Sequence, residues 1–357
     1  MIKNIAAPRL RRLTIKPLLA CTGNCPHCKR RQDLHKDLRL RRQLSLEDWK
    51  RLLAEARGLG TVFLDISGGE PTLYKQLPEL IRVGRTHRFM VNLNSNGSLI
   101  DDGYAQELLR AGLNSITISL YSHQPDEHDS MKMSKGMWQK AVSAIEAFGR
   151  LGRRYPAFKV KTQTILCREN YKSFAGSMEL YYRLGAYAVA MNYLEGDFAR
   201  EFLLNEGEIR HFRKEVIPRV VSCCKKSALR VRNKAIRMVR SIFAENILSD
   251  ADWAEGAYRP KNKNFPPCPV PRHYAMILAN GDVHPCEIVE YTHAPVAGNV
   301  FNNSLREIWQ GERFADFRKA PPAECRFCPV NLHLYIPLKP TGLIYGWNVV
   351  RRMLSSS

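Results

Sequence analysis

Residues 20–31 read ACTGNCPHCKRR and place three cysteines, Cys21, Cys25 and Cys28, in a C-x3-C-x2-C spacing. The apolar run at 13–19 is typical of a buried strand, so the cysteines fall on the loop that follows its C-terminal end. Three thiolates on one short loop can face one metal centre, and a cubane iron–sulfur cluster held by three thiolates keeps one iron open. The sequence therefore predicts a metal-binding loop from Cys21 to Cys28, which we call the cysteine loop.

A structural zinc site is the alternative for this loop. Tetrahedral zinc takes four ligands and favours paired C-x2-C units, whereas the cysteine loop offers three thiols. His27 could be the fourth ligand, but it lies between Cys25 and Cys28, where the backbone would have to fold sharply. The motifs further along the chain agree better with an iron–sulfur cluster.

Beyond the cysteine loop, helical and strand patterns alternate along the chain. Helical spacing of apolar residues predicts helices at 46–57, 75–86, 101–111, 137–151 and 171–184. Short apolar runs predict strands at 61–67, 89–93, 115–120, 158–166 and 186–193. With the run at 13–19, the alternation predicts an α/β fold with a parallel sheet, in which ligands collect at the C-terminal ends of the strands.

Polar motifs stand where the predicted strands end. The second strand runs into Gly68, Gly69, Glu70 and Pro71, in which the glycines let the backbone approach a ligand closely and Glu70 supplies an acceptor. A Gly-Gly turn alone is weak evidence, because such pairs are most often just turns. Its position after the strand that follows the cysteine loop makes the motif more specific.

The third and fourth strands end in further polar residues. Ser95 and Asn96 follow the third strand in a segment that could also be an ordinary Asn-Gly turn. Ser119 ends the fourth strand, and the segment HDSMK that follows finishes at Lys132.

Together these motifs resemble the radical SAM superfamily. The resemblance implies a partial (β/α)6 TIM-type barrel, with a [4Fe–4S] cluster on Cys21, Cys25 and Cys28 whose open iron holds S-adenosylmethionine (SAM). The implied SAM-binding residues are His27, Gly68, Gly69, Glu70, Pro71, Ser95, Asn96, Ser119 and Lys132. Lys132 stands where the family commonly has an arginine, and a lysine keeps the charge but loses the bidentate geometry.

Four more cysteines lie near the C-terminal end: Cys268, Cys286, Cys325 and Cys328. A hairpin is predicted at 275–284 and a helix at 305–317. This arrangement is similar to the twitch domain, the shortened form of the SPASM extension of radical SAM enzymes, and implies one auxiliary [4Fe–4S] cluster on the four cysteines. A zinc site made of the same four thiolates is the alternative.

The resemblance also implies a reaction. SAM would be cleaved reductively to a 5′-deoxyadenosyl radical, which removes hydrogen from a small anionic metabolite that is phosphorylated, sugar-like or lipid-linked. The auxiliary cluster would exchange an electron with the substrate radical, so dehydrogenation is expected ahead of epimerisation or bond formation. An external reductant of the flavodoxin or ferredoxin type is implied, and no catalytic base is assigned. Maturation of a ribosomal peptide is the main alternative, followed by RNA modification.

The composition indicates which partners and which cellular compartment to expect for this protein. The 357 residues include 55 Lys and Arg against 34 Asp and Glu, and this net charge of +21 favours anionic partners. Aromatic residues do not interleave with the basic runs as a base-stacking platform would require, which argues against nucleic acid. Ten cysteines without a secretory signal predict metal or redox chemistry in a reducing cytoplasm. The apolar, basic tail at 332–357 could add a peripheral contact with an anionic membrane.

The expected organisation has a basic N-terminal segment, a barrel, a helical basic connector, a twitch domain and a tail. Their bounds are 1–12, 13–200, 201–262, 263–331 and 332–357. Cys167 and the Cys223–Cys224 pair lie outside the ligand spacings and are expected to be buried structural thiols.

Overall fold

The structure, a computed structural model, describes residues 8–28, 42–192, 194, 197–225, 248–257, 268, 270–287, 296–319 and 325. Within these ranges nine strands form one sheet in the order β6-β5-β4-β3-β2-β1-β7-β8-β9. The strands are β1 (Arg12–Lys16), β2 (Phe63–Ile66), β3 (Met90–Ser95), β4 (Ser115–Ser119), β5 (Lys159–Ile165), β6 (Ala188–Asn192), β7 (Tyr274–Leu278), β8 (Asp282–His284) and β9 (Gly298–Asn299).

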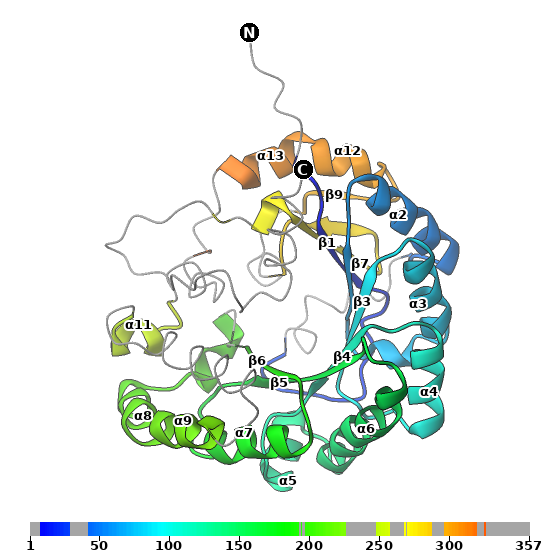
Figure 1. The fold of residues 1–357 in the computed structure, drawn as a ribbon. Helices are drawn as coiled ribbons and strands as arrows, with labels where there is room; N and C mark the ends of the chain where they lie inside the picture. Colours follow the sequence, from blue (N-terminus) through cyan, green and yellow to red (C-terminus); the bar gives the residue numbers. More distant parts are fainter. Residues whose placement is uncertain are drawn as a thin grey trace.

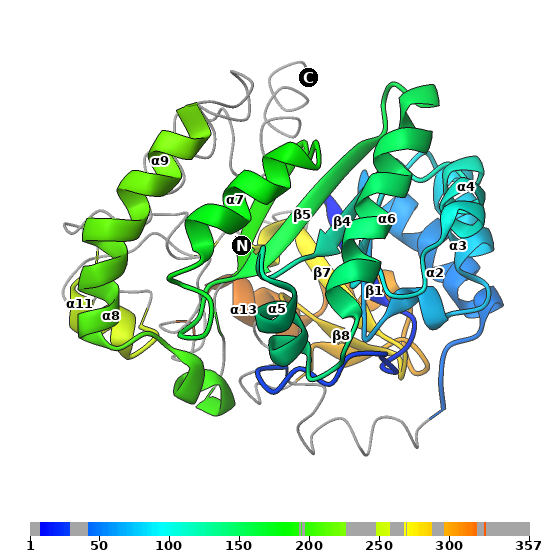
Figure 2. The same ribbon diagram turned by 90° about the horizontal axis from the view of Figure 1, so that it is seen from below.

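Neighbouring strands from β6 across to β7 are parallel, and β8 and β9 add antiparallel pairs. The sheet curves around an interior, with its helices on the outside (Figure 1). The same arrangement is seen from below in Figure 2, where α6 and α7 cross the outer side of β4 and β5. This architecture confirms the predicted α/β class with a partial barrel.

The helices of the described ranges follow the predicted alternation. They are α2 (Leu46–Gly58), α3 (Leu77–Thr86), α4 (Asp102–Arg110), α5 (Pro125–Lys132), α6 (Met137–Leu151), α7 (Phe174–Arg183), α8 (Glu206–His211), α9 (Ile217–Lys225), α11 (Asp250–Ala254), α12 (Leu305–Gln310) and α13 (Glu312–Lys319). Short helical turns add η3 (Pro71–Leu73), η4 (Gly152–Arg154), η5 (Asp197–Phe202), η6 (Phe212–Val216, a π-helical turn) and η7 (Val270–Arg272). Helix α5 was not predicted. It begins at Pro125, and Met133 ends it in the left-handed conformation at φ 48°.

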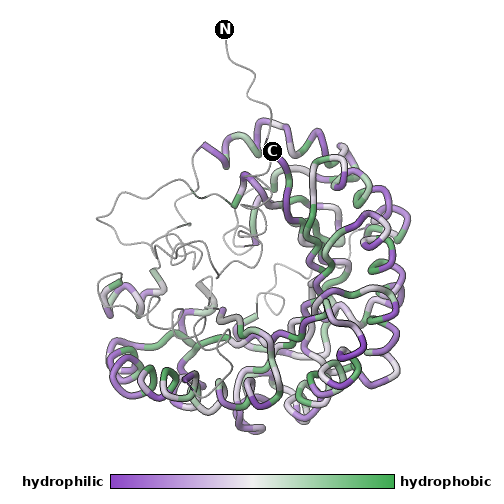
Figure 3. Tube along the Cα trace, in the orientation of Figure 1, coloured by the Kyte–Doolittle hydropathy of each residue, from purple (hydrophilic) through white to green (hydrophobic). Residues whose placement is uncertain are grey.

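The hydrophobic core lies between the sheet and the outer helices. Alternate strand residues such as Leu13, Ile15, Leu64 and Ile66 are fully buried in it, together with Trp49 of α2. Hydrophobic stretches accordingly run along the strands, while hydrophilic stretches recur along the surrounding helices (Figure 3). The other face of β1 to β4 points into the barrel, and there the sequence supplies polar residues such as Thr14, Asp65, Asn92 and Thr117.

The C-terminal hairpin is part of the barrel sheet. Strand β7 pairs in parallel with β1 over its whole length, from Arg12 opposite Tyr274 to Lys16 opposite Leu278. The predicted hairpin turn is present, with Gly281 at φ 83°, a backbone conformation that favours glycine. The pairing with β1 was not predicted.

The predicted cluster ligand Cys328 and the predicted tail at 332–357 lie outside the described residues. So do 1–7 of the predicted N-terminal segment and 226–247 and 258–262 of the predicted connector. Among the described helices, none is both long and apolar enough to cross a membrane.

Candidate functional site

The cysteine loop leaves the C-terminal end of β1, as predicted. Cys21, Cys25 and Cys28 are each half-buried, and none forms a disulfide. A Cβ atom built on Gly23 would lie 3.7 Å from Cys25 Sγ and 4.0 Å from Cys21 Sγ. Two of the sulfurs therefore flank the one residue of the loop that has no side chain.

The glycine pair after β2 packs against the chain that leads into the cysteine loop. The Gly69 N–H donates to Leu18 O at 3.1 Å, and the Glu70 N–H donates to Ala20 O at 2.7 Å. A Cβ atom on Gly69 would lie 2.1 Å from Ala20 O. The structure thus shows a physical need for glycine here that the sequence analysis did not anticipate, because the close approach is to the chain's own backbone.

Glu70 is fully buried and ties the ends of β2 and β3 together. Its Oε1 accepts hydrogen bonds from the Thr72 N–H at 3.1 Å, the Thr72 hydroxyl at 2.6 Å and the Ser95 hydroxyl at 2.7 Å. Its Oε2 accepts one from the Asn96 N–H at 2.7 Å. Most of the acceptor capacity of this carboxylate is therefore used by its own chain, and one position on Oε2 is left for a further donor.

Asn96 connects the end of β3 to the cysteine loop. Its Nδ2 donates to Thr22 Oγ1 at 2.9 Å and lies 3.7 Å from Cys21 Sγ. Thr22 Oγ1 is also 2.7 Å from the Ser98 hydroxyl. Sequence reasoning missed Thr22 and Ser98, and the only signal was their position inside or beside the two polar motifs.

An aromatic group covers one side of the cysteine loop. The His27 ring lies 5.6 Å from the Tyr121 ring and 6.0 Å from the Phe202 ring, centre to centre. Burial, followed by the nearby Lys132 charge, lowers the pKa of His27 to about 4. His27 is therefore a neutral aromatic group at pH 7, consistent with a residue that packs beside a ligand.

The remaining predicted SAM contacts differ in exposure. Ser119 ends β4 half-buried, paired in register with Gln163. Pro71 is buried at the start of η3. Lys132 is buried at the end of α5, with its Nζ 3.8 Å from the centre of the Tyr121 ring, and its carbonyl accepts the Asn24 N–H at 3.0 Å. The predicted residues thus lie in the cysteine loop itself or at and after the C-terminal ends of β2, β3 and β4. Of these, Asn96 and Lys132 bond directly to the cysteine loop, and Gly69 and Glu70 bond to the residues that lead into it.

Two of the C-terminal cysteines, Cys268 and Cys286, lie toward the other end of β1. Cys286 follows β8, and in the register of β7 and β8 Met276 stands opposite His284, so the chain after His284 returns toward the start of β7. Glu287 accepts hydrogen bonds from the Tyr274 hydroxyl at 3.0 Å and from Thr14 Oγ1 at 3.4 Å. Cys268 precedes η7 and β7 on the same side. Helix α13, which precedes Cys325, is held there by a bond of 3.1 Å from Arg318 Nε to Pro271 O.

Polar residues line the inner face of the barrel between these two ends. Asp65 forms an ion pair with Arg12 and accepts a hydrogen bond from Asn92 Nδ2 at 3.1 Å. Asn92 in turn accepts from the hydroxyls of Ser115, at 2.7 Å, and Thr117, at 3.3 Å. This row crosses β1 to β4 and gives the interior a polar wall.

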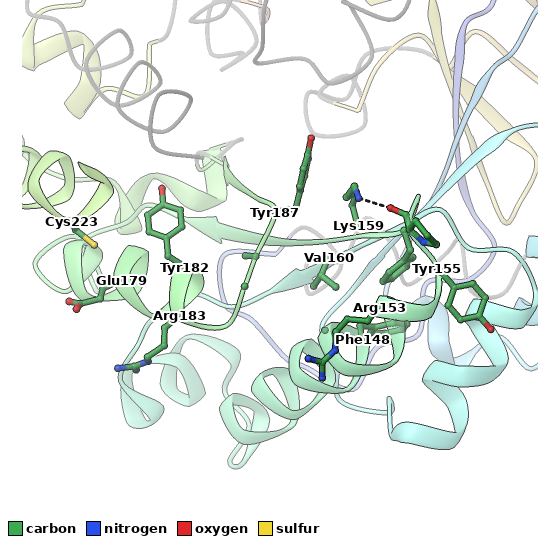
Figure 4. A pocket seen from close by; sticks show the side chains of 16 residues that line it. Phe148, Arg153, Tyr155, Lys159, Val160, Glu179, Tyr182, Arg183, Tyr187 and Cys223 are labelled. Carbon is green, nitrogen blue, oxygen red and sulfur yellow. Dashed lines mark hydrogen bonds between the residues drawn. The ribbon is translucent and has the colours of Figure 1, made fainter. Parts of the chain in front are cut away.

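A groove of about 730 Å³ lies elsewhere, at the N-terminal ends of β5 and β6. Figure 4 shows Tyr155, Lys159, Tyr187 and Cys223 among its lining residues, with Lys159 Nζ donating to Pro156 O at 2.9 Å. Ligands of parallel sheets bind at the opposite, C-terminal ends of the strands, so this groove is not part of the candidate site.

Two of the cysteines that were not assigned to a cluster, Cys167 and Cys223, differ in how deeply they are buried. Cys167 is fully buried, and burial raises the pKa of its thiol, as a structural role requires. Cys223 is only half-buried and lines the groove, so the expectation of a buried thiol is wrong there. The reason is that α9 places Cys223 beside the groove and not inside the core.

The comparisons with known proteins agree with this geometry. Residues 15–181 match the family model described as the radical SAM superfamily, and residues 268–329 match the SPASM model, an iron–sulfur cluster-binding domain. The chain contains a radical SAM domain followed by a SPASM domain. A radical SAM domain implies SAM and a [4Fe–4S] cluster, and a SPASM domain implies auxiliary iron–sulfur clusters.

Among curated relatives, a PqqA peptide cyclase of Granulibacter bethesdensis is 24% identical over 315 residues, which cover 86% of this chain and 76% of the relative. An AdoMet-dependent heme synthase of Methanosarcina barkeri is 24% identical over 329 residues, covering 89% of this chain and 86% of the relative. The crystal structure of Streptococcus suis SuiB matches with a TM-score of 0.65 at 16% identity, over 98% of this chain and 75% of SuiB. The SuiB likeness shows the radical SAM fold.

The donor chemistry fits the implied groups. Soft thiols in sets of three and four are the ligands that iron–sulfur clusters prefer. Hydrogen bonds from the segments at Gly69, Glu70 and Asn96 hold the cysteine loop and the residues before it, so the chain itself fixes the position of this loop. Among the described residues, no three Cys, His, Asp or Glu side chains converge closely enough to hold a single metal ion.

Proposed function

We propose that this radical SAM protein removes a hydrogen atom from an anionic small molecule held inside the barrel and oxidises it. The observation that carries the proposal is the cysteine loop after β1. Asn96 bonds to this loop, and Gly69 and Glu70 bond to the residues that lead into it. The ligands of the first cluster would be Cys21, Cys25 and Cys28. When bound, SAM and this cluster supply a 5′-deoxyadenosyl radical, which can attack an unactivated C–H bond.

The protein's own part is positioning and exclusion of water. The fully buried Glu70 fixes the loops after β2 and β3, and His27 with Tyr121 and Phe202 covers the cysteine loop with apolar surface. Holding reactants in one geometry supplies much of the rate in such chemistry, and a dry site protects a reactive intermediate. The SAM contacts would be the residues named for them in the sequence.

The polar interior supports an anionic substrate. The inner face of β1 carries Lys16 and that of β5 carries Lys161, and the whole chain has a net charge of +21. The second cluster would be held by Cys268, Cys286, Cys325 and Cys328. Because Cys286 follows β8 near the start of β7, it lies toward the opposite end of β1 from the cysteine loop, and a substrate between the two sets of cysteines would be positioned to pass an electron to the second cluster.

A peptide substrate is the second candidate, and the relatives favour it. Several curated relatives are named PqqA peptide cyclase, and one of the similar structures is SuiB bound to precursor peptide SuiA. The two candidates share the site and differ in what enters the barrel.

The first experiment is to reconstitute the protein anaerobically and count iron and sulfide. About eight irons per chain would support two [4Fe–4S] clusters. The variant with Cys21, Cys25 and Cys28 all changed to Ala should lose about four irons and all SAM-dependent 5′-deoxyadenosine. Undiminished 5′-deoxyadenosine from that variant would overturn the proposal.

The second experiment separates the two substrate classes. Wild-type enzyme with SAM and reductant would be incubated with the small-molecule fraction or the peptide fraction of an extract of the source cells. The fraction that raises 5′-deoxyadenosine above the substrate-free rate holds the substrate. Transfer of deuterium from a labelled substrate into 5′-deoxyadenosine would identify the hydrogen removed.

A further inference from the structure

The groove of about 730 Å³ at the N-terminal ends of β5 and β6 is lined by residues from several separate elements. They come from the ends of α6 and α7, from η4 and α9, and from the residues that lead into β5 and β6 (Figure 4). Small-molecule sites in proteins have volumes of about 300–1,000 Å³. The groove is therefore large enough for a ligand of the size of a metabolite.

Among the described residues, three cations and one carboxylate line the groove. Arg153 belongs to η4, Lys159 begins β5 and Arg183 ends α7, while Glu179 of α7 is the acid. None of the three cations forms an ion pair within the part of the chain that the structure describes. Arg153 Nε and Lys159 Nζ donate to backbone carbonyls, at 3.5 Å and 2.9 Å. The groove therefore carries positive charge that an anionic ligand could neutralise.

Tyrosine rings line the same groove. Tyr155, Tyr182 and Tyr187 are each half-buried, so part of each side chain faces the open space. Tyr155 is held in place, because its hydroxyl accepts a hydrogen bond from Gln106 Nε2 at 3.0 Å. Lys159 Nζ lies 5.5 Å from the centre of the Tyr187 ring, which brings a positive charge beside an aromatic face. Such rings offer a planar ligand group a surface on which to stack.

Two glycines keep space open along the groove. Gly149 of α6 and Gly185 after α7 both line it, and a Cβ atom built on either would meet no other described atom within 4 Å. Gly185 has a φ of 75°, which a larger residue would not adopt easily, whereas Gly149 has ordinary helical backbone. A larger side chain at Gly149 would therefore project into the groove without straining the helix.

We propose that this groove is a binding site for a free nucleotide with at least two phosphates, separate from the SAM site. The phosphates would meet Arg153 and Arg183, whose planar guanidinium groups form paired hydrogen bonds with phosphate oxygens. The base would stack on the tyrosine rings, which accept any base because every base has a flat face. A nucleic-acid strand fits less well, because it needs rings and cations repeated along a longer path than one groove between helix ends.

The position of the groove makes this site independent of the proposed chemistry. The residues named for SAM lie in the cysteine loop or at and after the C-terminal ends of β2, β3 and β4, whereas the groove lies at the N-terminal ends of β5 and β6. Nucleotide binding should therefore neither compete with SAM nor require the iron–sulfur clusters. Failure of the proposed function would leave this site untouched, and the reverse also holds.

The test is isothermal titration calorimetry of ADP into the reconstituted full chain, with excess SAM present to keep the adenine out of the SAM site. ADP should bind at a single site, and adenosine or pyrophosphate should bind at least about tenfold more weakly, because each lacks part of the contacts. Arg153→Gln combined with Arg183→Gln should weaken ADP binding by about a hundredfold. The matched control is Arg154→Gln with Arg219→Gln, which removes the same charge from exposed positions outside the groove.

Gly149→Leu is a second test that leaves every charge in place. It should fill the groove and abolish ADP binding, while α6 gains stability because leucine favours a helix more than glycine does. Ser143→Leu, at an exposed position of the same helix outside the groove, is the control and should bind ADP as wild type does.

Three results would overturn the proposal. One is the absence of saturable ADP binding to wild type, or unchanged binding in both the Gly149 variant and the double arginine variant, which would leave the arginines only a role at the helix ends. Another is pyrophosphate binding as tightly as ADP, which would indicate a simple anion site. The third is a short single-stranded RNA that binds at least about tenfold more tightly than ADP and is lost in the same variants, which would indicate a nucleic-acid site.

Discussion

Replacing Glu70 by glutamine removes one hydrogen bond and keeps the shape of the side chain. In the folded chain, three donors meet Oε1 and the Asn96 N–H meets Oε2. The glutamine oxygen can serve the three donors at the first position, but its NH2 group must then face the Asn96 N–H. Turning the amide over would set the NH2 group against three donors, which is worse.

The cost follows from that single mismatch. Hydrogen bonds to a charged acceptor contribute about 1.5–3 kcal/mol, and a buried donor left unsatisfied costs a similar amount, so we expect about 2–3 kcal/mol. An unfolding entropy of about 2.1 cal/mol/K per residue makes each kcal/mol worth about 1.3 °C of melting temperature in a chain of 357 residues, so we expect a fall of about 3–4 °C.

Thermal unfolding followed by circular dichroism, on protein without clusters or SAM, measures this shift. Glu79→Gln is the matched control, because Glu79 forms an exposed ion pair with Arg82 and should lose under about 0.5 kcal/mol. A Glu70→Gln variant that melts together with Glu79→Gln would refute the assigned network.

Three further predictions concern the same region. Gly69→Ala should lower the iron content per chain by loss of the first cluster. The new Cβ would lie 2.1 Å from Ala20 O, and because this is a backbone atom, the chain that leads into the cysteine loop would have to move. Asp65→Asn should lower the unfolding free energy by about 1.5–3 kcal/mol in denaturant titration, because Arg12 loses its charged partner, while the exposed Asp102→Asn should have little effect. His128 has a folded pKa of about 2 against about 6.5 when unfolded, so the unfolded chain binds the extra proton and stability falls as pH drops below 6.5. His128→Asn, which keeps an acceptor for the Tyr121 N–H, should reduce this slope by about 1.4 kcal/mol per pH unit between pH 4.5 and 6, and an unchanged slope would contradict it.

The local patterns predicted the fold well where one face of an element is buried. Each predicted strand from 61–67 to 186–193 contains an observed strand, because apolar residues alternate with residues that face the interior. The prediction also placed the cysteine loop and the motifs at Glu70 and Asn96 at the C-terminal ends of the strands. Parallel strands bring their C-terminal ends together whatever the loop sequences are.

What escaped prediction depends on contacts between distant residues. The partners of Glu70 are 25 and 26 positions away at Ser95 and Asn96, and nothing local indicates which donors a buried carboxylate will meet. Helix α5 is short and starts at a proline, so it offers little periodicity to detect. The parallel pairing of β7 with β1 joins segments near opposite ends of the chain, and the hairpin signal at Gly281 says nothing about which strand lies beside it.

That last pairing has a consequence for how the protein is made. One edge of β1 can be completed only by β7, whose last residue, Leu278, follows Lys16 by about 260 positions. At ribosomal rates of about 5–20 residues per second, this edge waits roughly 13–50 s for its partner after β1 emerges. During that time the nascent chain exposes unpaired backbone beside the cysteine loop, which is the kind of edge that invites aggregation. Slowing translation before residue 274 would lengthen this exposure, and the yield of soluble protein should fall with it.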